Sequence, residues 1–79
     1  MFKLTIATVD KNLFEGEVSS VHCPGSDGEL TILAHHMPFI TTLAPGNVRV
    51  YQDKDSEEQS FDIKRGLLEV GNNKATILV

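Results

Sequence analysis

Apolar and polar residues alternate along much of the chain, as expected of strands that bury one face. The alternation is clearest over residues 2–7, 47–52 and 61–64. Successive side chains of a strand point to opposite faces, so a two-residue period indicates a half-buried strand. No segment carries the sustained 3.6-residue period of an amphipathic helix. The pattern predicts a chain built from strands, with helix content near zero.

Turn-forming residues divide this pattern into short pieces. Breaks are predicted at residues 10–12, 24–28, 34–38, 45–46, 53–58, 65–66 and 71–73. Many short strands with regularly spaced turn signals are typical of a β-sandwich or barrel. We therefore predict an all-β fold, a flattened antiparallel β-sandwich or barrel of about eight to ten short strands. Gly16, inside the extended stretch 13–23, is expected to mark a bulge or the close approach of another backbone.

Length, composition and charge narrow the class of protein. A chain of 79 residues is predicted to form a single domain, residues 1–79. Its 41% hydrophobic and 23% charged content argues against disorder. Seven basic residues against eleven acidic ones give a net charge of -4. With no basic cluster denser than Lys64 and Arg65, the sequence argues against nucleic acid or an anionic membrane surface as a partner.

Cysteine use and the lack of a long apolar run indicate the compartment. Cys23 is the only cysteine of the sequence, which excludes an internal disulfide and fits a reducing environment. No apolar run approaches the roughly 18 residues that span a bilayer. The N-terminal residues also lack the apolar stretch of a signal peptide. These features predict a soluble domain in the cytoplasm.

The residues that bind metals lack the spacing of a metal site. His22 and Cys23 are neighbours in a predicted strand, so their side chains are expected on opposite faces. Zinc sites of this size usually use paired ligands, as in Cys-x-x-Cys. The acidic run 53–58 begins like a calcium loop, but glycine is missing at the sixth position and glutamate at the twelfth. We predict no metal site.

Catalytic and nucleotide-binding patterns are also missing. The serines of the sequence lack the Gly-x-Ser-x-Gly turn that exposes a nucleophile. The glycine-containing run 25–28 precedes no predicted helix, whose N-terminus would be needed to bind a phosphate. We therefore predict no catalytic residues, no nucleotide site and no cofactor.

Lys54 suggests one alternative function. It follows Asp53 at the tip between two predicted strands of an acidic domain. In this respect the chain resembles lipoyl or biotinyl carrier domains, in which such a lysine is the attachment site. The acidic residues that follow Lys54 and the lack of a two-fold repeat argue against this reading. A carrier domain modified at Lys54 remains the alternative.

Five short motifs in a fixed order point to a known family. They are LFEGEV at 13–18, PGSDGEL at 24–30, HMPFI at 36–40, LAPGNVRV at 43–50 and GLLEV at 66–70. In order and spacing they resemble the N-terminal β-sandwich domain of the ATP synthase epsilon subunit, which is called delta in mitochondria. Two positions depart from the family pattern: His35 stands where glycine is often found, and Arg65 replaces a small residue. Most epsilon subunits continue into a C-terminal helical hairpin, so the resemblance is to a short form without it.

The resemblance implies a mechanical role. Such a domain is a non-catalytic subunit of the rotor, or central stalk, of a rotary proton-translocating ATP synthase. It docks on the gamma subunit and the c ring and thereby couples proton flow to ATP synthesis. Its expected location is the cytoplasmic face of the cell membrane, as a peripheral part of the complex, without insertion into the bilayer.

Two sets of contact residues are carried over from the family. The loop expected to face the c ring consists of Ser26, Asp27, Gly28 and Glu29. The surface expected to face the gamma subunit consists of Thr8, His36, Pro38, Phe39 and Thr41. Because glutamate is rarely buried without a partner, the Glu29 carboxylate is expected to be exposed at one end of the sandwich.

Overall fold

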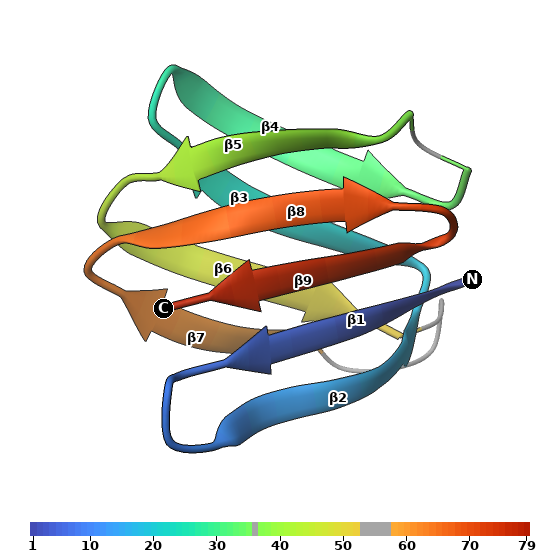
Figure 1. The fold of residues 1–79 in the computed structure, drawn as a ribbon, viewed down its shortest axis with the longest axis horizontal. Helices are drawn as coiled ribbons and strands as arrows, with labels where there is room; N and C mark the ends of the chain where they lie inside the picture. Colours follow the sequence, from blue (N-terminus) through green and yellow to red (C-terminus); the bar gives the residue numbers. More distant parts are fainter. Residues whose placement is uncertain (36, 53–57) are drawn as a thin grey trace.

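The computed structural model describes residues 1–35, 37–52 and 58–79 and contains nine strands in that part of the chain (Figure 1). The strands are β1 (Phe2–Ala7), β2 (Asn12–Val18), β3 (Ser20–Gly25), β4 (Gly28–Leu33), β5 (Phe39–Leu43), β6 (Gly46–Tyr51), β7 (Gln59–Ile63), β8 (Gly66–Gly71) and β9 (Lys74–Leu78). No helix occurs within these described ranges. The predicted all-β fold of about eight to ten short strands is confirmed.

Backbone pairing joins the strands into one sheet that folds over itself. The strand order is β2-β1-β9-β8-β5-β3-β6-β7, and β4 pairs with the free side of β3. In Figure 1, β1, β9, β8 and β5 lie in front, and β3, β4 and β6 lie behind them. The two halves therefore face each other as the layers of a sandwich, and their inward side chains form one core.

Strand β3 connects the two layers by changing its partner. Residues Ser20, Val21 and His22 pair with β6, whereas Gly25 pairs with Leu43 of β5. The opposite side of β3 pairs with β4 along its whole length. Because one strand pairs with both layers, the layers are continuous rather than two separate sheets.

The first and last strands lie side by side. Strands β1 and β9 run parallel, with Lys3 opposite Lys74 and Ala7 opposite Leu78. Every other pairing that the structure describes is antiparallel. The sequence pattern predicted antiparallel pairing throughout, and the β1–β9 pair is the exception. The sequence could not indicate this pair, because the two strands are far apart in the chain and no single turn connects them. The two ends of the chain consequently lie at opposite ends of this strand pair (Figure 1).

Apolar side chains from both layers fill the space between them. The buried cluster consists of Phe2, Leu4, Ile6, Val18, Val21, Cys23, Ile32, Leu43, Val48, Val50, Ile63, Leu68, Val70, Ala75 and Ile77. Phe14 and Phe61 close one border of this core with an edge-to-face ring contact, at a centroid distance of 6.1 Å. The alternation read from the sequence gives the correct inward face for β1. For β6 it left both faces open, and the structure places Val48 and Val50 inside.

The bulge expected at Gly16 lies elsewhere. Gly16 pairs regularly with Leu4, and the register shifts further along the strand, where Ile6 faces Phe14 and Ala7 faces Asn12. Leu13 is thus the extra residue of the bulge. A side chain at Gly16 would meet only ordinary contacts, the nearest at 3.6 Å, so neither a bulge nor a close backbone explains this glycine.

The predicted loop 24–28 is also shorter than expected. Pro24 and Gly25 belong to β3, and Gly28 already begins β4, which leaves a two-residue turn. Proline is unfavourable inside a sheet because it lacks an N–H group. Pro24 lies beyond the last β3 residue paired with β6, and its carbonyl oxygen accepts a hydrogen bond from the backbone N–H of Ala44 over 2.7 Å.

Leu68 tests whether the two layers share one core. Its side chain is fully buried in β8, so Leu68→Ala should lower the free energy of unfolding by about 2–5 kcal/mol through lost burial and a residual cavity. The neighbouring Leu67, 38% exposed on the outer face, is the matched control, and Leu67→Ala should change stability by less than about 1 kcal/mol. Urea unfolding of both variants measures the difference; similar losses would contradict this core.

Candidate functional site

The turn between β3 and β4 is held firmly against β5. The backbone N–H of Ser26 donates to the carbonyl oxygen of Thr42 over 3.1 Å. The two hydroxyl groups of the same residues lie 2.8 Å apart in a hydrogen bond. The turn therefore presents Ser26 and Asp27 from a fixed position at one corner of the sandwich.

Two glycines give this turn its shape for different reasons. A Cβ atom at Gly25 would lie 2.5 Å from the carbonyl oxygen of Gly28, which no side chain could accept without movement of the backbone. Gly28 has a φ of 134°, a conformation that favours glycine. The space around Gly28 is open: among the described residues, no atom beyond its two chain neighbours would lie within 4 Å of a Cβ atom added there. Of these two glycines, Gly25 is thus closely packed and Gly28 is accessible.

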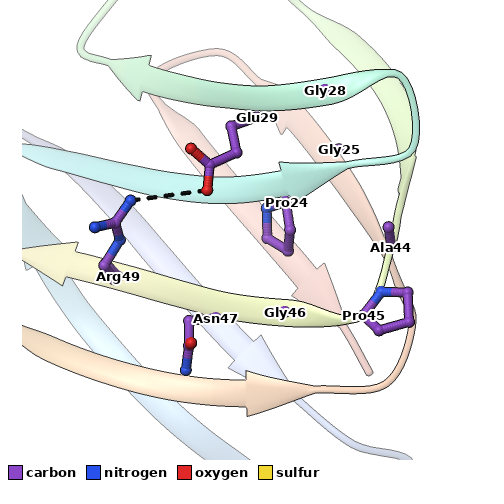
Figure 2. Close-up of a pocket in the computed structure, with 9 residues that line it drawn as sticks. All are labelled: Pro24, Gly25, Gly28, Glu29, Ala44, Pro45, Gly46, Asn47 and Arg49. Carbon is purple, nitrogen blue, oxygen red and sulfur yellow. Dashed lines mark ion pairs between the residues drawn. The ribbon is translucent and has the colours of Figure 1, made fainter.

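A pocket of about 540 Å³ lies beside this turn, at the corner where β3 leaves β6 and joins β5 (Figure 2). We call it the corner pocket; its lining includes Pro24, Glu29, Pro45, Gly46, Asn47 and Arg49. The first residue of β6 must pass closely over β3 here, since a Cβ atom at Gly46 would lie 3.0 Å from the ring of Pro24. The corner pocket therefore results directly from the change of partner by β3.

Charged side chains border the corner pocket on one side. The carboxylate of Glu29 lies 3.9 Å from a terminal nitrogen of Arg49, and the Glu29 side chain is 73% exposed. The Nε atom of Arg49 lies 3.8 Å from a carboxylate oxygen of Glu58. These exposed pairs contribute little to stability, since such pairs are usually worth about 0–1 kcal/mol. The exposure of Glu29 agrees with the expectation from the sequence.

The residues expected to face the gamma subunit do not form one compact patch. Thr8 directly follows the end of β1, whereas Phe39 is the first residue of β5 and Pro38 directly precedes it. These two positions are at opposite ends of the same layer. Thr41 is half-buried in β5. His36 lies outside the described residues.

Thr8 also has a local structural role. Its hydroxyl oxygen accepts hydrogen bonds from the backbone N–H groups of Asp10 and Lys11, over 3.2 and 3.1 Å. Its backbone N–H donates to the carbonyl oxygen of Lys11 over 2.8 Å. The side chain thus closes the β1–β2 turn, a common use of threonine in turns.

An apolar group on the outer face lies between these expected contact residues. Ile40, Leu67 and Leu78 are 63%, 38% and 49% exposed, and we call them the outer apolar patch. Leu67 and Leu78 are direct partners on β8 and β9. Ile40 lies on the adjacent strand β5, where its direct partner is Glu69 and the partner of Leu67 is Thr42, so Ile40 is a diagonal neighbour of Leu67. Sequence reasoning missed this patch. One available signal was the pair Leu67–Leu68, since adjacent residues of a strand cannot both face the core.

The described residues contain no group of three or more His, Cys, Asp or Glu side chains that could hold a metal ion. As expected from their adjacency, His22 and Cys23 face opposite sides of β3, with Cys23 in the core. The His22 ring lies on the outer face, with Nδ1 2.9 Å from the Thr31 hydroxyl oxygen and its plane at 74° to that of Tyr51. Lys54, the attachment site of the alternative carrier function, lies outside the described residues.

Cys23 is protected by burial. Loss of solvation raises the pKa of its thiol from 9.0 to about 12, because the core disfavours the charged thiolate. The unfolded thiol ionises first, so stability associated with this group is present below about pH 9 and falls as the pH rises toward about 12.

The native chain should therefore resist alkylation of Cys23 by iodoacetamide at about pH 8, since the thiolate is the reactive form. The same chain in urea should be labelled completely. Intact mass measured over time gives both rates, and the urea sample controls for reagent quality. Equal labelling rates with and without urea would contradict the burial of this thiol.

Taken together, these features define a small β-sandwich that offers two kinds of surface: a charged corner with a firm turn, and an exposed apolar face. Residues 1–79 match the family model described as "ATP synthase, Delta/Epsilon chain, beta-sandwich domain", and the chain belongs to this family. The described part of the chain contains no helix that is long and apolar enough to cross a membrane.

Curated relatives carry the same family name. The chain is 41% identical over 78 residues to the "ATP synthase epsilon chain" of Protochlamydia amoebophila, covering 99% of this chain and 52% of the relative. It is 46% identical over 77 residues to the epsilon chain of Chlorobium limicola, covering 98% of this chain and 86% of the relative. The chain thus spans about half the length of the first relative and most of the second.

Solved structures share the fold. One chain of the Tetrahymena thermophila mitochondrial ATP synthase central stalk and c ring matches with a TM-score of 0.80 and 21% identity, covering 98% of this chain and 61% of that one. One chain of the Euglena gracilis mitochondrial ATP synthase OSCP/F1/c-ring structure matches with a TM-score of 0.87 and 24% identity, covering 96% and 48%. At these identities the likeness establishes the β-sandwich fold.

Proposed function

We propose that this chain is a non-catalytic rotor subunit of a rotary proton-translocating ATP synthase. In this role it docks on the gamma subunit and the c ring and helps to couple proton flow to ATP synthesis. The observation that carries the proposal is the family match over the entire chain, residues 1–79. The named source structures, a central stalk with c ring and an F1 with c ring, support the same assembly.

The charged corner is the surface that we assign to the c ring. It comprises the turn residues Ser26 and Asp27 together with Gly28 and Glu29. Two features support this assignment: the turn is fixed on β5 by the hydrogen bonds of Ser26, and Glu29 is exposed beside it. A fixed turn suits a contact that carries load, because little backbone order has to be gained on docking.

The layer formed by β1, β9, β8 and β5 carries the surface that we assign to the gamma subunit. Thr8 lies at one end of this layer and Pro38 and Phe39 at the other, with His36 and Thr41 assigned to the same surface from the family. The outer apolar patch lies between these two ends. Exposed apolar side chains that gather on one face often mark a protein interface, so we include the patch in this surface.

The proposed location follows from these contacts. A subunit docked on the c ring would lie peripherally at the membrane, and we assign it to the cytoplasmic face. Its own chemistry would be limited to binding, without cofactor or catalytic residue. Its mechanical property would be the stiffness of a small sandwich with short turns.

Recovery of partners from membranes tests the assembly directly. A tagged copy of the chain, expressed in its own source, should recover the gamma subunit and c subunits from solubilised membranes, with identification by mass spectrometry. Intact mass of the recovered chain also tests the carrier alternative, since a lipoyl or biotinyl group on Lys54 would add mass. Recovery of a modified chain without ATP synthase subunits would contradict the proposal.

Ile40→Asp should weaken recovery of the gamma subunit, because it replaces the most exposed side chain of the outer apolar patch with a charged one. Removing such an anchor typically weakens binding by about 1–2 kcal/mol or more. Leu33→Asp is the matched control: Leu33 is 57% exposed and lies on β4, in the other layer. Normal gamma recovery by Ile40→Asp, or equal loss in both variants, would contradict this assignment of the patch.

Glu29→Ala should weaken docking on the ring while leaving the fold intact. Loss of one polar partner at a partly desolvated contact should weaken docking by about 1–3 kcal/mol, whereas an exposed substitution should change unfolding by less than about 0.5 kcal/mol. Thermal unfolding of the chain and ATP-driven proton pumping in reconstituted membranes measure the two effects. A destabilised chain with normal pumping would instead make Glu29 a structural residue.

A further inference from the structure

Arg49 lies between two carboxylates on the outer face of the layer formed by β4, β3, β6 and β7. One terminal nitrogen lies 3.9 Å from Glu29, and its Nε atom lies 3.8 Å from Glu58. Figure 2 shows the first contact crossing β3 beside Pro24, with both side chains at the edge of the corner pocket. Of the cationic side chains that the structure describes, Arg49 is the one within ion-pair distance of Glu29.

The strand register explains why these two side chains meet. Glu29 is paired with Pro24, and Arg49 is paired with His22, two residues earlier on β3. Glu29 and Arg49 are therefore diagonal neighbours across the intervening strand. The compact ring of Pro24 occupies little of the outer face, so the carboxylate and the guanidinium can approach above it (Figure 2).

The second contact orients the guanidinium. Glu58 holds the Nε side of Arg49, which turns the terminal nitrogens toward Glu29. Glu58 also accepts a hydrogen bond from the Tyr51 hydroxyl over 3.2 Å, so its carboxylate is itself held in place. The Arg49 side chain is 39% exposed and the Glu29 side chain 73% exposed, so the more enclosed partner is the arginine.

We propose that Arg49 is a positioning residue that holds the Glu29 carboxylate at the edge of the corner pocket, ready for contact with the c ring. The inference rests on the proposed function. A free glutamate side chain has many rotamers, and fixing it on docking opposes binding. Arg49 limits this freedom before docking occurs. The ion pair adds little to folding stability because it is exposed, so the effect of losing it should appear in docking.

The test is a double-mutant cycle in the assembled enzyme. Membranes containing ATP synthase stripped of this subunit are titrated with the chain, and the concentration that restores half of ATP-driven proton pumping is measured. By the cost of immobilising one side chain, Arg49→Met should raise this concentration about threefold to tenfold. In a chain already carrying Glu29→Ala, the same substitution should change it by less than about twofold, because the residue through which Arg49 acts is missing.

Two further variants separate positioning from general charge or stability effects. Arg49→Lys should recover part of the loss, because it keeps a cation near Glu29. Glu58→Gln, which removes one partner of Arg49 but leaves the Arg49–Glu29 pair, should have a smaller effect than Arg49→Met. Thermal unfolding of every variant should stay close to that of the unmodified chain.

The outcomes distinguish failure of the inference from failure of the proposed function. If Glu29→Ala weakens restoration and Arg49→Met does not, the ring contact stands and the positioning role is wrong. If Arg49→Met is equally harmful with and without Glu29, Arg49 acts independently of it and the inference is also wrong. If Glu29→Ala has no effect, the ring contact at Glu29 and the inference fail together.

Discussion

The change of partner by β3 is the constraint on which the rest of the structure depends. A single strand pairs with β6 through His22 and with β5 through Gly25, so the two layers must diverge at Pro24. This divergence closes the core, since it turns Leu43 and Val48 toward the same interior. It also produces the corner pocket and brings Glu29 and Arg49 together above the proline. Fold and candidate site therefore have one geometric origin.

Local features of the fold were predictable from the sequence, and long-range features were not. Alternation and turn residues predicted the strands and the inward face of β1, because both depend on neighbouring residues. The position of the bulge at Leu13 depends on how β1 and β2 pair. The inclusion of Pro24 and Gly25 in β3 depends on β5 and β6, which follow later in the chain. Pairing between distant strands leaves no local pattern to read.

The candidate site shows the same division. The family motifs identified the turn at Ser26 and the adjacent Glu29, because those residues stand in a recognisable order. They did not identify Arg49 as the neighbour of Glu29, since 20 positions separate them and the register brings them together. The outer apolar patch was also missed, because apolar residues in strands are first assigned to the core. The expected gamma-facing residues mark the two ends of a layer whose exposed centre became visible only in three dimensions.

The parallel pairing of β1 with β9 gives the sandwich a particular response to force. The hydrogen bonds of a parallel pair are evenly spaced along the strands, here from Lys3 beside Lys74 to Ala7 beside Leu78. A pull on the two ends of the chain would drag these strands past each other lengthwise. Such shear loads the whole ladder together, whereas peeling would break its bonds one after another. The β1–β9 pairing thus meets a lengthwise force with all of its hydrogen bonds at once.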